Sequence, residues 1–296
     1  MKHLRQIAIC AGLIALVTAG CNDALGPSTA LYRIAFAGCL EGRCWFVSYR
    51  EDGTEAELLF ESSNYIFCPS VSPDGHRVVF EDYPTGRIVE VNLQTHSKTQ
   101  LVSDSRPTHC PSLSRDGARI AYYAGTIGDL WLMVANADGS NPRQLWDGVG
   151  HLHAPAWSAD GRSLAVPDAA GRIVEVDVET GSEVRVVSAS GFQAAWRPDG
   201  SAIVVTRQLT NATVLVWVNA DGSGERLLSP LIDRNDHSQH AFPSWAPDGQ
   251  RLAFRRFVDP GPSMARTAGV MTASGQIINW PNNATFMAEA IMWLPR

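Results

Sequence analysis

The sequence predicts an all-β fold: a six-bladed β-propeller with four-stranded blades, whose closing blade is shared between the N- and C-terminal strands. Three observations predict this fold. An Asp-Gly turn motif recurs five times at intervals of 39 to 49 residues, a second turn follows the first in the repeats, and the two chain ends carry complementary parts of one repeat. A period of this length is typical of propeller blades.

Each repeat combines a short strand, an Asp-Gly turn and a three-residue apolar run. Asp accepts hydrogen bonds inside such a turn and Gly adopts its left-handed position, while the apolar run is typical of a buried strand. The five copies are Ser72–Phe80, Ser114–Tyr122, Ser158–Val166, Arg197–Val205 and Ala246–Phe254.

The second turn gives each repeat two hairpins and therefore four strands, named a to d from the axis outward. These turns are Asn136–Gly139, Glu179–Gly181, Asn219–Gly222 and Ala273–Gly275. Strand a precedes the Asp-Gly turn, and we expect its last apolar residue to wedge between neighbouring blades. The wedge residues are Val71, Leu113, Trp157, Trp196 and Trp245.

The two chain ends supply the sixth blade. Ala290–Arg296 matches strand a up to its proline, and Arg33–Phe60 supplies strands b, c and d with no strand a before them. A blade completed in this way closes the ring and removes exposed sheet edges, which would otherwise aggregate.

The first 20 residues have the features of an export signal. Lys2 and Arg5 precede the apolar run Ile7–Val17, which is too short to span a bilayer. We therefore expect residues 1–20 to be a signal peptide that takes no part in the fold.

The residues around Cys21 resemble the cleavage site of bacterial lipoproteins. We expect a lipidated Cys21, a tether over residues 21–30 and a propeller over residues 31–296. Asn22 follows the cysteine, so the resemblance implies a lipid-anchored protein of the cell envelope, periplasm-facing or at the outer membrane. An ordinary secretory signal cut near Ala19 is the alternative.

Composition limits the partners. The chain has 24 Lys and Arg against 30 Asp and Glu, a formal charge of −6, which argues against nucleic acid as a partner. No further stretch approaches 18 apolar residues, so we expect membrane contact only through the lipid anchor.

Four cysteines remain in the expected propeller, and they are interpreted as structural. Cys39 and Cys44 bracket a hairpin turn, which favours a disulfide. Cys68 and Cys110 occupy the same place in adjacent repeats. They can form a disulfide only if the channel is narrow there, because bridged Cα atoms lie about 4.4 to 6.8 Å apart.

The propeller repeat resembles that of a known family. Trp245-Ala-Pro-Asp-Gly-Gln-Arg-Leu-Ala-Phe254 and the terminal Trp293-Leu-Pro295 are similar to repeats of TolB, the periplasmic protein of the Tol-Pal system. The resemblance covers residues 31–296 and implies a six-bladed propeller. The α/β domain that precedes the propeller in TolB has no counterpart here, so we expect a TolB-like lipoprotein and not TolB itself.

Long loops and histidines gather on one predicted face. The d–a and b–c loops share this face, which lies opposite the Asp-Gly turns, and the long loops Ser229–Gln239 and Val258–Thr267 fall on it. The residues expected to bind a ligand at this mouth of the channel are His109, His151, His153, His237, His240, Phe67 and Phe192.

Three of these histidines stand at nearly the same height in their repeats. His109, His153 and His240 could hold a divalent transition metal such as Zn, Mn or Ni, or they could be polar residues of a wet funnel. His240 is one residue out of step, which in a strand turns a side chain to the other face. Apart from this possible metal, no cofactor is expected.

Two functions remain open. The first is a non-catalytic binding or scaffold lipoprotein that presents the mouth to an envelope protein, a peptide or a glycan. The alternative is a metal-dependent oligosaccharide lyase or hydrolase that uses the channel histidines, since some oligosaccharide lyases have similar blades. The sequence has no Gly-x-Ser-x-Gly elbow, which argues against an enzyme of the prolyl-oligopeptidase type, and it has no phosphate loop or dinucleotide fingerprint.

Overall fold

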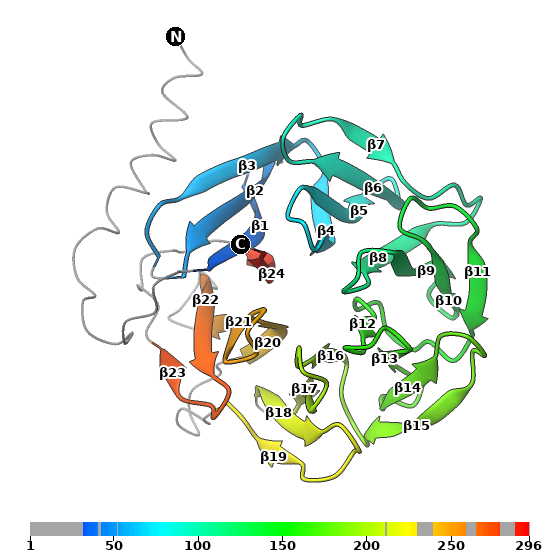
Figure 1. The fold of residues 1–296 in the computed structure, drawn as a ribbon, viewed down its shortest axis with the longest axis vertical. Helices are drawn as coiled ribbons and strands as arrows, with labels where there is room; N and C mark the ends of the chain where they lie inside the picture. Colours follow the sequence, from blue (N-terminus) through cyan, green and yellow to red (C-terminus); the bar gives the residue numbers. More distant parts are fainter. Residues whose placement is uncertain are drawn as a thin grey trace.

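The computed structural model describes residues 32–40, 43–51, 53–210, 212–229, 239–258, 265–278 and 288–295. The strands form six blades around a central axis (Figure 1). The expected signal peptide and tether, residues 1–30, lie outside the described residues. Among the residues that the structure describes, no helix is long and apolar enough to cross a membrane.

The first three blades follow the predicted a-to-d order. Blade 1 consists of β24 (Ala288–Leu294), β1 (Arg33–Leu40), β2 (Arg43–Arg50) and β3 (Glu57–Ser62). Blade 2 consists of β4 (Tyr65–Val71), β5 (Arg77–Tyr83), β6 (Arg87–Asn92) and β7 (Lys98–Gln100). Blade 3 consists of β8 (Thr108–Leu113), β9 (Arg119–Thr126), β10 (Asp129–Asn136) and β11 (Arg143–Trp146).

The other three blades repeat the arrangement. Blade 4 consists of β12 (Ala156–Trp157), β13 (Ser163–Pro167), β14 (Ile173–Asp177) and β15 (Glu183–Ser188). Blade 5 consists of β16 (Gln193–Trp196), β17 (Ala202–Gln208), β18 (Thr213–Asn219) and β19 (Arg226–Leu227). Blade 6 consists of β20 (Gln239–Trp245), β21 (Arg251–Val258), β22 (Ala265–Thr272) and β23 (Ile277–Ile278).

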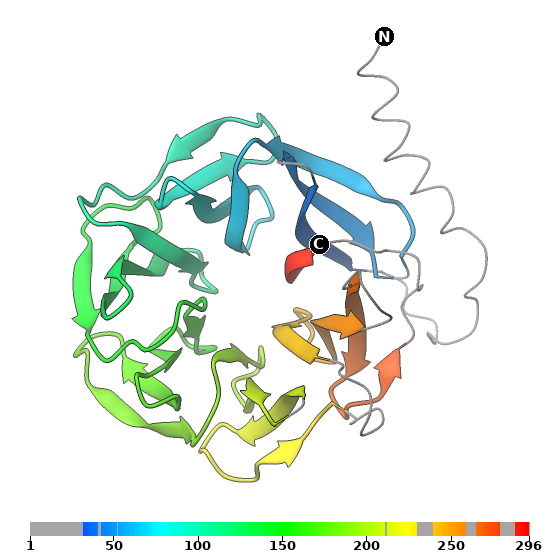
Figure 2. The same ribbon diagram turned by 180° about the vertical axis from the view of Figure 1, so that it is seen from behind.

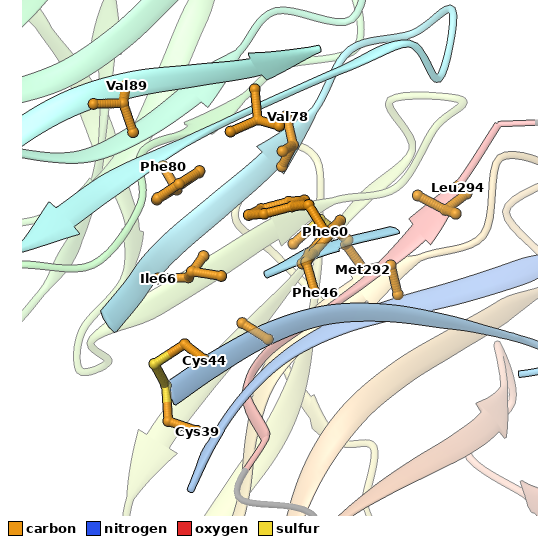
Figure 3. Close-up of a cluster of buried hydrophobic side chains, with 13 residues drawn as sticks. Cys39, Cys44, Phe46, Phe60, Ile66, Val78, Phe80, Val89, Met292 and Leu294 are labelled. Atoms are coloured by element: carbon orange, nitrogen blue, oxygen red, sulfur yellow. A yellow bond between two sulfur atoms is a disulfide. The ribbon is translucent and has the colours of Figure 1, made fainter. Parts of the chain in front are cut away.

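Blade 1 confirms the predicted closure. The C-terminal strand β24 pairs antiparallel with β1, so that Trp293 lies opposite Ile34. Met292 and Leu294 pack into a cluster with residues of blades 1 and 2, among them Phe46 and Phe80 (Figure 3). The last strand therefore completes blade 1 and also packs against blade 2.

The wedge residues also lie between blades as expected. The indole N–H of Trp157 donates to the Ser112 carbonyl at 2.9 Å, and that of Trp293 donates to the Ser244 carbonyl at 2.9 Å. Each of these bonds joins an innermost strand to the innermost strand of the preceding blade. The tryptophans thus fix neighbouring blades to each other beside the channel.

The Asp-Gly turns combine internal bonds with contacts between blades. In blade 2 the Ser72 hydroxyl and the His76 N–H donate to Asp74 at 2.5 and 3.0 Å, and these bonds lower the pKa of Asp74. Gly75 has a φ of +73°, and a Cβ there would meet the Pro295 ring at 3.0 Å. This turn therefore needs glycine for its backbone and also for its contact with the end of the chain.

Candidate functional site

The innermost strands of all six blades surround a central channel of about 380 Å³. Figures 1 and 2 show the ring from its two sides. The strands β4, β8, β12, β16, β20 and β24 provide the walls, which carry prolines, small residues and tryptophans. A channel with such walls offers apolar contact and few side-chain hydrogen bonds.

The chain direction gives the channel two different ends. The Asp-Gly turns lie at one end, named the turn face, where Arg115, Ala159, Pro198 and Pro247 line the channel. The d–a and b–c loops lie at the other end, named the mouth. The two long loops that indicated a binding face, 229–239 and 258–267, fall largely outside the described residues.

A bulge shapes several innermost strands near the mouth. Cys68, Cys110 and Phe242 have positive φ angles of 45°, 46° and 57°, and the register shifts beside each of them. A positive φ is uncommon for residues other than glycine, and bulges of this kind redirect side chains. Here the bulge directs Cys68 and Phe242 toward the channel lining.

Aromatic rings from three blades meet on one side of the mouth. The ring of His153 lies 5.1 Å from that of Phe192 and 6.1 Å from that of Phe242. The Arg255 guanidinium stacks on Phe242, with its central carbon 3.9 Å from the ring centroid. Burial, His151 and Arg255 together lower the pKa of His153 to about 4, so its imidazole is neutral at physiological pH.

The buried side chain of Gln193 supports this aromatic cluster. Its amide oxygen accepts a hydrogen bond from the Phe242 backbone N–H at 2.9 Å, across the boundary between blades 5 and 6. Because this bond holds the bulged segment of β20, the Phe242 ring keeps its place beside His153.

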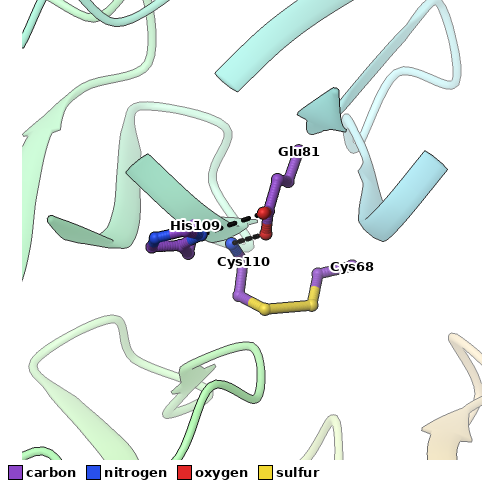
Figure 4. The surroundings of a disulfide bond; sticks show 4 residues. All are labelled: Cys68, Glu81, His109 and Cys110. Atoms are coloured by element: carbon purple, nitrogen blue, oxygen red, sulfur yellow. Dashed lines mark hydrogen bonds and ion pairs between the residues drawn. A yellow bond between two sulfur atoms is a disulfide. The ribbon is translucent and has the colours of Figure 1, made fainter. Parts of the chain in front are cut away.

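The opposite side of the mouth is polar and cross-linked (Figure 4). His109 Nδ1 lies 2.9 Å from a Glu81 carboxylate oxygen, and Nε2 lies 3.2 Å from the Gly125 carbonyl. Burial alone would lower the pKa of His109, but the bonds to Glu81 and Gly125 outweigh it and the pKa is raised. The neighbouring Cys110 is joined to Cys68 in blade 2 by a disulfide with a Cα separation of 4.8 Å.

The other predicted disulfide forms, and Phe67 lies in an aromatic group of blade 2. Cys39 and Cys44 form a disulfide across the β1–β2 hairpin. Phe67 packs edge-on against Tyr83 at 5.5 Å, beside the half-exposed Tyr65. Blade 2 thus adds a second aromatic group to the mouth.

The histidines proposed as metal ligands do not come together. His109 bonds Glu81, His153 packs on two phenylalanines, and His240 is buried in its own blade with its ring 4.9 Å from Phe254. Within the described ranges no three His, Cys, Asp or Glu side chains form a group that could hold a metal. His151 is exposed, and His237 lies outside the described residues.

Sequence reasoning missed Phe242 and Arg255. Arg255 directly follows the apolar run of its repeat, where Glu81 stands in blade 2 and Thr206 in blade 5. Glu81 and Arg255, the charged residues at this strand position, both reach the mouth. A charged residue directly after the apolar run could therefore have indicated a residue of the site. Phe242 carried no such signal, because its direction depends on the bulge.

Comparison with known proteins places these features in a family context. Residues 46–279 match the model of the TolB beta propeller domain. The chain is 27% identical over 166 residues to a TolB homolog from Chlorobium luteolum, a match that covers 55% of this chain and 36% of that protein. The chain thus spans about a third of that curated relative.

Solved structures agree on the fold. TolB from Acinetobacter baumannii superimposes with a TM-score of 0.75 at 17% identity, covering 90% of this chain and 67% of that one. An oligogalacturonate lyase in complex with manganese superimposes with a TM-score of 0.52 at 18% identity, covering 85% of this chain and 72% of that one. At these identities the likeness concerns the fold alone.

Proposed function

The chain belongs to the TolB beta propeller domain family, and from this premise we propose that it is a non-catalytic binding module of the bacterial cell envelope. Its propeller would engage an envelope protein, a peptide or a glycan at the mouth of the channel. The observation that carries this proposal is the aromatic cluster of His153, Phe192 and Phe242, which three blades bring together beside an open channel.

The physical chemistry of the mouth suits binding. Aromatic rings provide a large contact area at low conformational cost and are frequent among the residues that dominate interface energies. The stacked Arg255 adds a cation that can donate to carbonyl or carboxylate oxygens. A neutral His153 can donate and accept hydrogen bonds at the same surface.

The enzymatic alternative lacks comparable support. It needs several ligands around one ion, and the described part of the chain brings no three candidate ligands together. The manganese of the superimposed lyase belongs to that protein. We therefore propose the binding function alone.

The mouth can be tested by capture from an envelope extract. The lipid-free domain, residues 31–296, should retain its partner, and Phe192→Ala should reduce the amount captured about tenfold, because truncated aromatic anchors cost that much or more. Val184→Ala, an exposed residue of the outer strand β15, is the matched control and should capture as wild type does. Quantitative mass spectrometry of the captured material provides the measurement.

Two outcomes of the capture experiment would contradict the proposal. Equal capture by Phe192→Ala and wild type would place the binding surface elsewhere. A transition metal that copurifies at one ion per chain and is lost from His109→Ala and His153→Ala would instead support the enzymatic alternative.

The same proposal includes the lipid anchor at Cys21. The disulfides Cys39–Cys44 and Cys68–Cys110 support an oxidising compartment such as the periplasm, where such bonds persist. Wild-type protein expressed with its leader should incorporate radiolabelled palmitate and sediment with membranes. Cys21→Ser should lose the label and either become soluble or accumulate as precursor, and a wild-type protein without label would exclude the anchor.

A further inference from the structure

A single charged side chain lines the described part of the channel. Arg115 occupies the second position of the Asp-Gly turn in blade 3 and reaches the channel at the turn face. The equivalent residues of the other blades carry no charge: they are Pro73, Ala159, Pro198, Pro247 and Pro295. Arg115 therefore departs from the repeat at a place where its side chain meets the channel.

The Arg115 guanidinium crosses the channel. Its Nη2 donates to the Pro247 carbonyl at 3.5 Å. Pro247 follows β20 in blade 6, which stands opposite blade 3 in the ring (Figure 1). Because the side chain starts at one wall and contacts the other, its positive charge lies across the axis of the channel.

The contacts of Arg115 do not neutralise it. In the described part of the chain no carboxylate forms an ion pair with Arg115, whereas Arg197 pairs with Asp199 at 2.5 Å. The adjacent Asp116 accepts from the Ser114 hydroxyl at 2.5 Å and from the Ala118 N–H at 3.0 Å. Both nearby carboxylates are therefore bonded within their own turns.

The channel wall removes part of the water around this cation, although the residue as a whole is exposed. This partial desolvation lowers the pKa of Arg115, and the charge of Asp199 opposes the shift. A partly desolvated cation gains from an ionised partner, and guanidinium groups bind carboxylates through two parallel hydrogen bonds. The long bond to a carbonyl leaves most of the donors of Arg115 available for such a partner.

We propose that the turn face of the channel is a carboxylate-binding site centred on Arg115, which takes the acidic C-terminal end of a peptide that enters from the mouth. This inference rests on the proposed binding function and names the chemistry of its ligand. It also orients the peptide in the channel. The C-terminus lies at the turn face, since Arg115 is at the far end of the channel from the aromatic cluster.

The walls favour a peptide over a glycan. A sugar needs hydrogen-bond partners for several hydroxyl groups on each ring, and the polar side chains of the lining are few: Ser70, Ser112, Gln193 and Ser244. Prolines and tryptophans dominate the rest, and they offer apolar contact to an extended chain. A volume of about 380 Å³ fits a short segment and not a folded domain.

Matched peptides can test the site. The probes are acetyl-Ala-Ala-Ser-Asp with a free C-terminus and acetyl-Ala-Ala-Ser-Asn with an amidated one, which have nearly the same shape and differ by two negative charges. Calorimetry and the fluorescence of the channel tryptophans report binding. We expect wild type to bind the acidic probe at least about tenfold more tightly than the neutral one, as expected for charge-assisted hydrogen bonds.

Two variants isolate Arg115. Arg115→Pro introduces the residue that most other repeats carry, so its turn should remain folded. We expect this variant to bind the acidic and the neutral probe about equally. Arg162→Gln makes the same change of charge on an 86% exposed side chain of the neighbouring turn and should keep the wild-type preference. Thermal melting of each variant checks the fold.

Several results would overturn the site. They are a wild-type protein that binds the two probes equally, no binding of the acidic probe at millimolar concentration, an Arg115→Pro variant that keeps its preference, or Arg162→Gln losing it as well. If trigalacturonate binds in an Arg115-dependent way and the acidic peptide does not bind, the ligand of the site is an acidic glycan and not a peptide. Loss of partner capture in Phe192→Ala does not enter this test, so the two proposals can fail separately.

Discussion

Deleting Ala288–Arg296 should abolish the folded ring. The deletion removes β24, whose Ile291, Met292, Trp293 and Leu294 are all buried. Full burial of such side chains contributes about 1.5 to 3 kcal/mol each, so their loss removes about 6 to 12 kcal/mol from a fold whose total stability is on the order of 5 to 15 kcal/mol. The deletion also exposes the edge of β1 to other chains.

Chemical denaturation and size-exclusion chromatography should show the loss directly. The truncated protein should be unfolded or aggregated at 25 °C. Trp293→Ala, which keeps the strand, should lose about 3 to 5 kcal/mol and remain cooperative, whereas Ile127→Ala, at an 83% exposed position, should match wild type. A monodisperse truncated protein with unchanged thermal stability would contradict a ring that depends on its shared blade.

The fold could be predicted because its determinants are local and repeated. Asp74 and Gly75 set their turn through bonds within a few residues, and the same pattern returns in five of the six blades. The contact of the Trp157 indole with the Ser112 carbonyl could be expected because adjacent repeats are neighbours in space. The closure by β24 follows from a repeat that begins at one end of the chain and ends at the other.

The site was less predictable because side-chain direction depends on the bulges. Equal spacing correctly placed His153 and Phe192 together, since both precede their turns by the same number of residues. His240, one residue out of step, is buried against Phe254. Phe242 enters the same cluster only through its positive φ, which no residue type in the sequence announces.

Lowering the pH should destabilise the protein through His153. Burial, His151 and Arg255 hold the pKa of His153 at about 4, against 6.5 for the unfolded chain. Below pH 6.5 the unfolded state takes up a proton that the folded state refuses, so stability is lost as the pH falls from 6.5 toward 4. At pH 4.5 the loss from this residue amounts to about 2.5 kcal/mol.

His109 should act in the opposite direction. Its bonds to Glu81 and Gly125 raise its pKa, so its contribution to stability is fully present below pH 6.5 and is lost as the pH rises through the folded value. His109→Gln should therefore show a larger drop in stability between pH 7.5 and pH 4.5 than wild type does. The two histidines, which belong to the adjacent blades 3 and 4, thus oppose each other in their pH dependence.

His153→Phe isolates the first effect, because Phe67 and Phe192 stand at the same position in their own repeats and the ring contact with Phe192 is kept. Between pH 7.5 and pH 4.5 the variant should lose about 2.5 kcal/mol less stability than wild type, or roughly 5 to 10 °C less in melting temperature. His96→Asn, an exposed residue at a φ of 57° that asparagine tolerates, should keep the wild-type dependence. Urea unfolding at both pH values measures the difference. If His153→Phe and wild type lose stability in parallel, His153 titrates normally, and the desolvated aromatic cluster at the mouth does not form in solution.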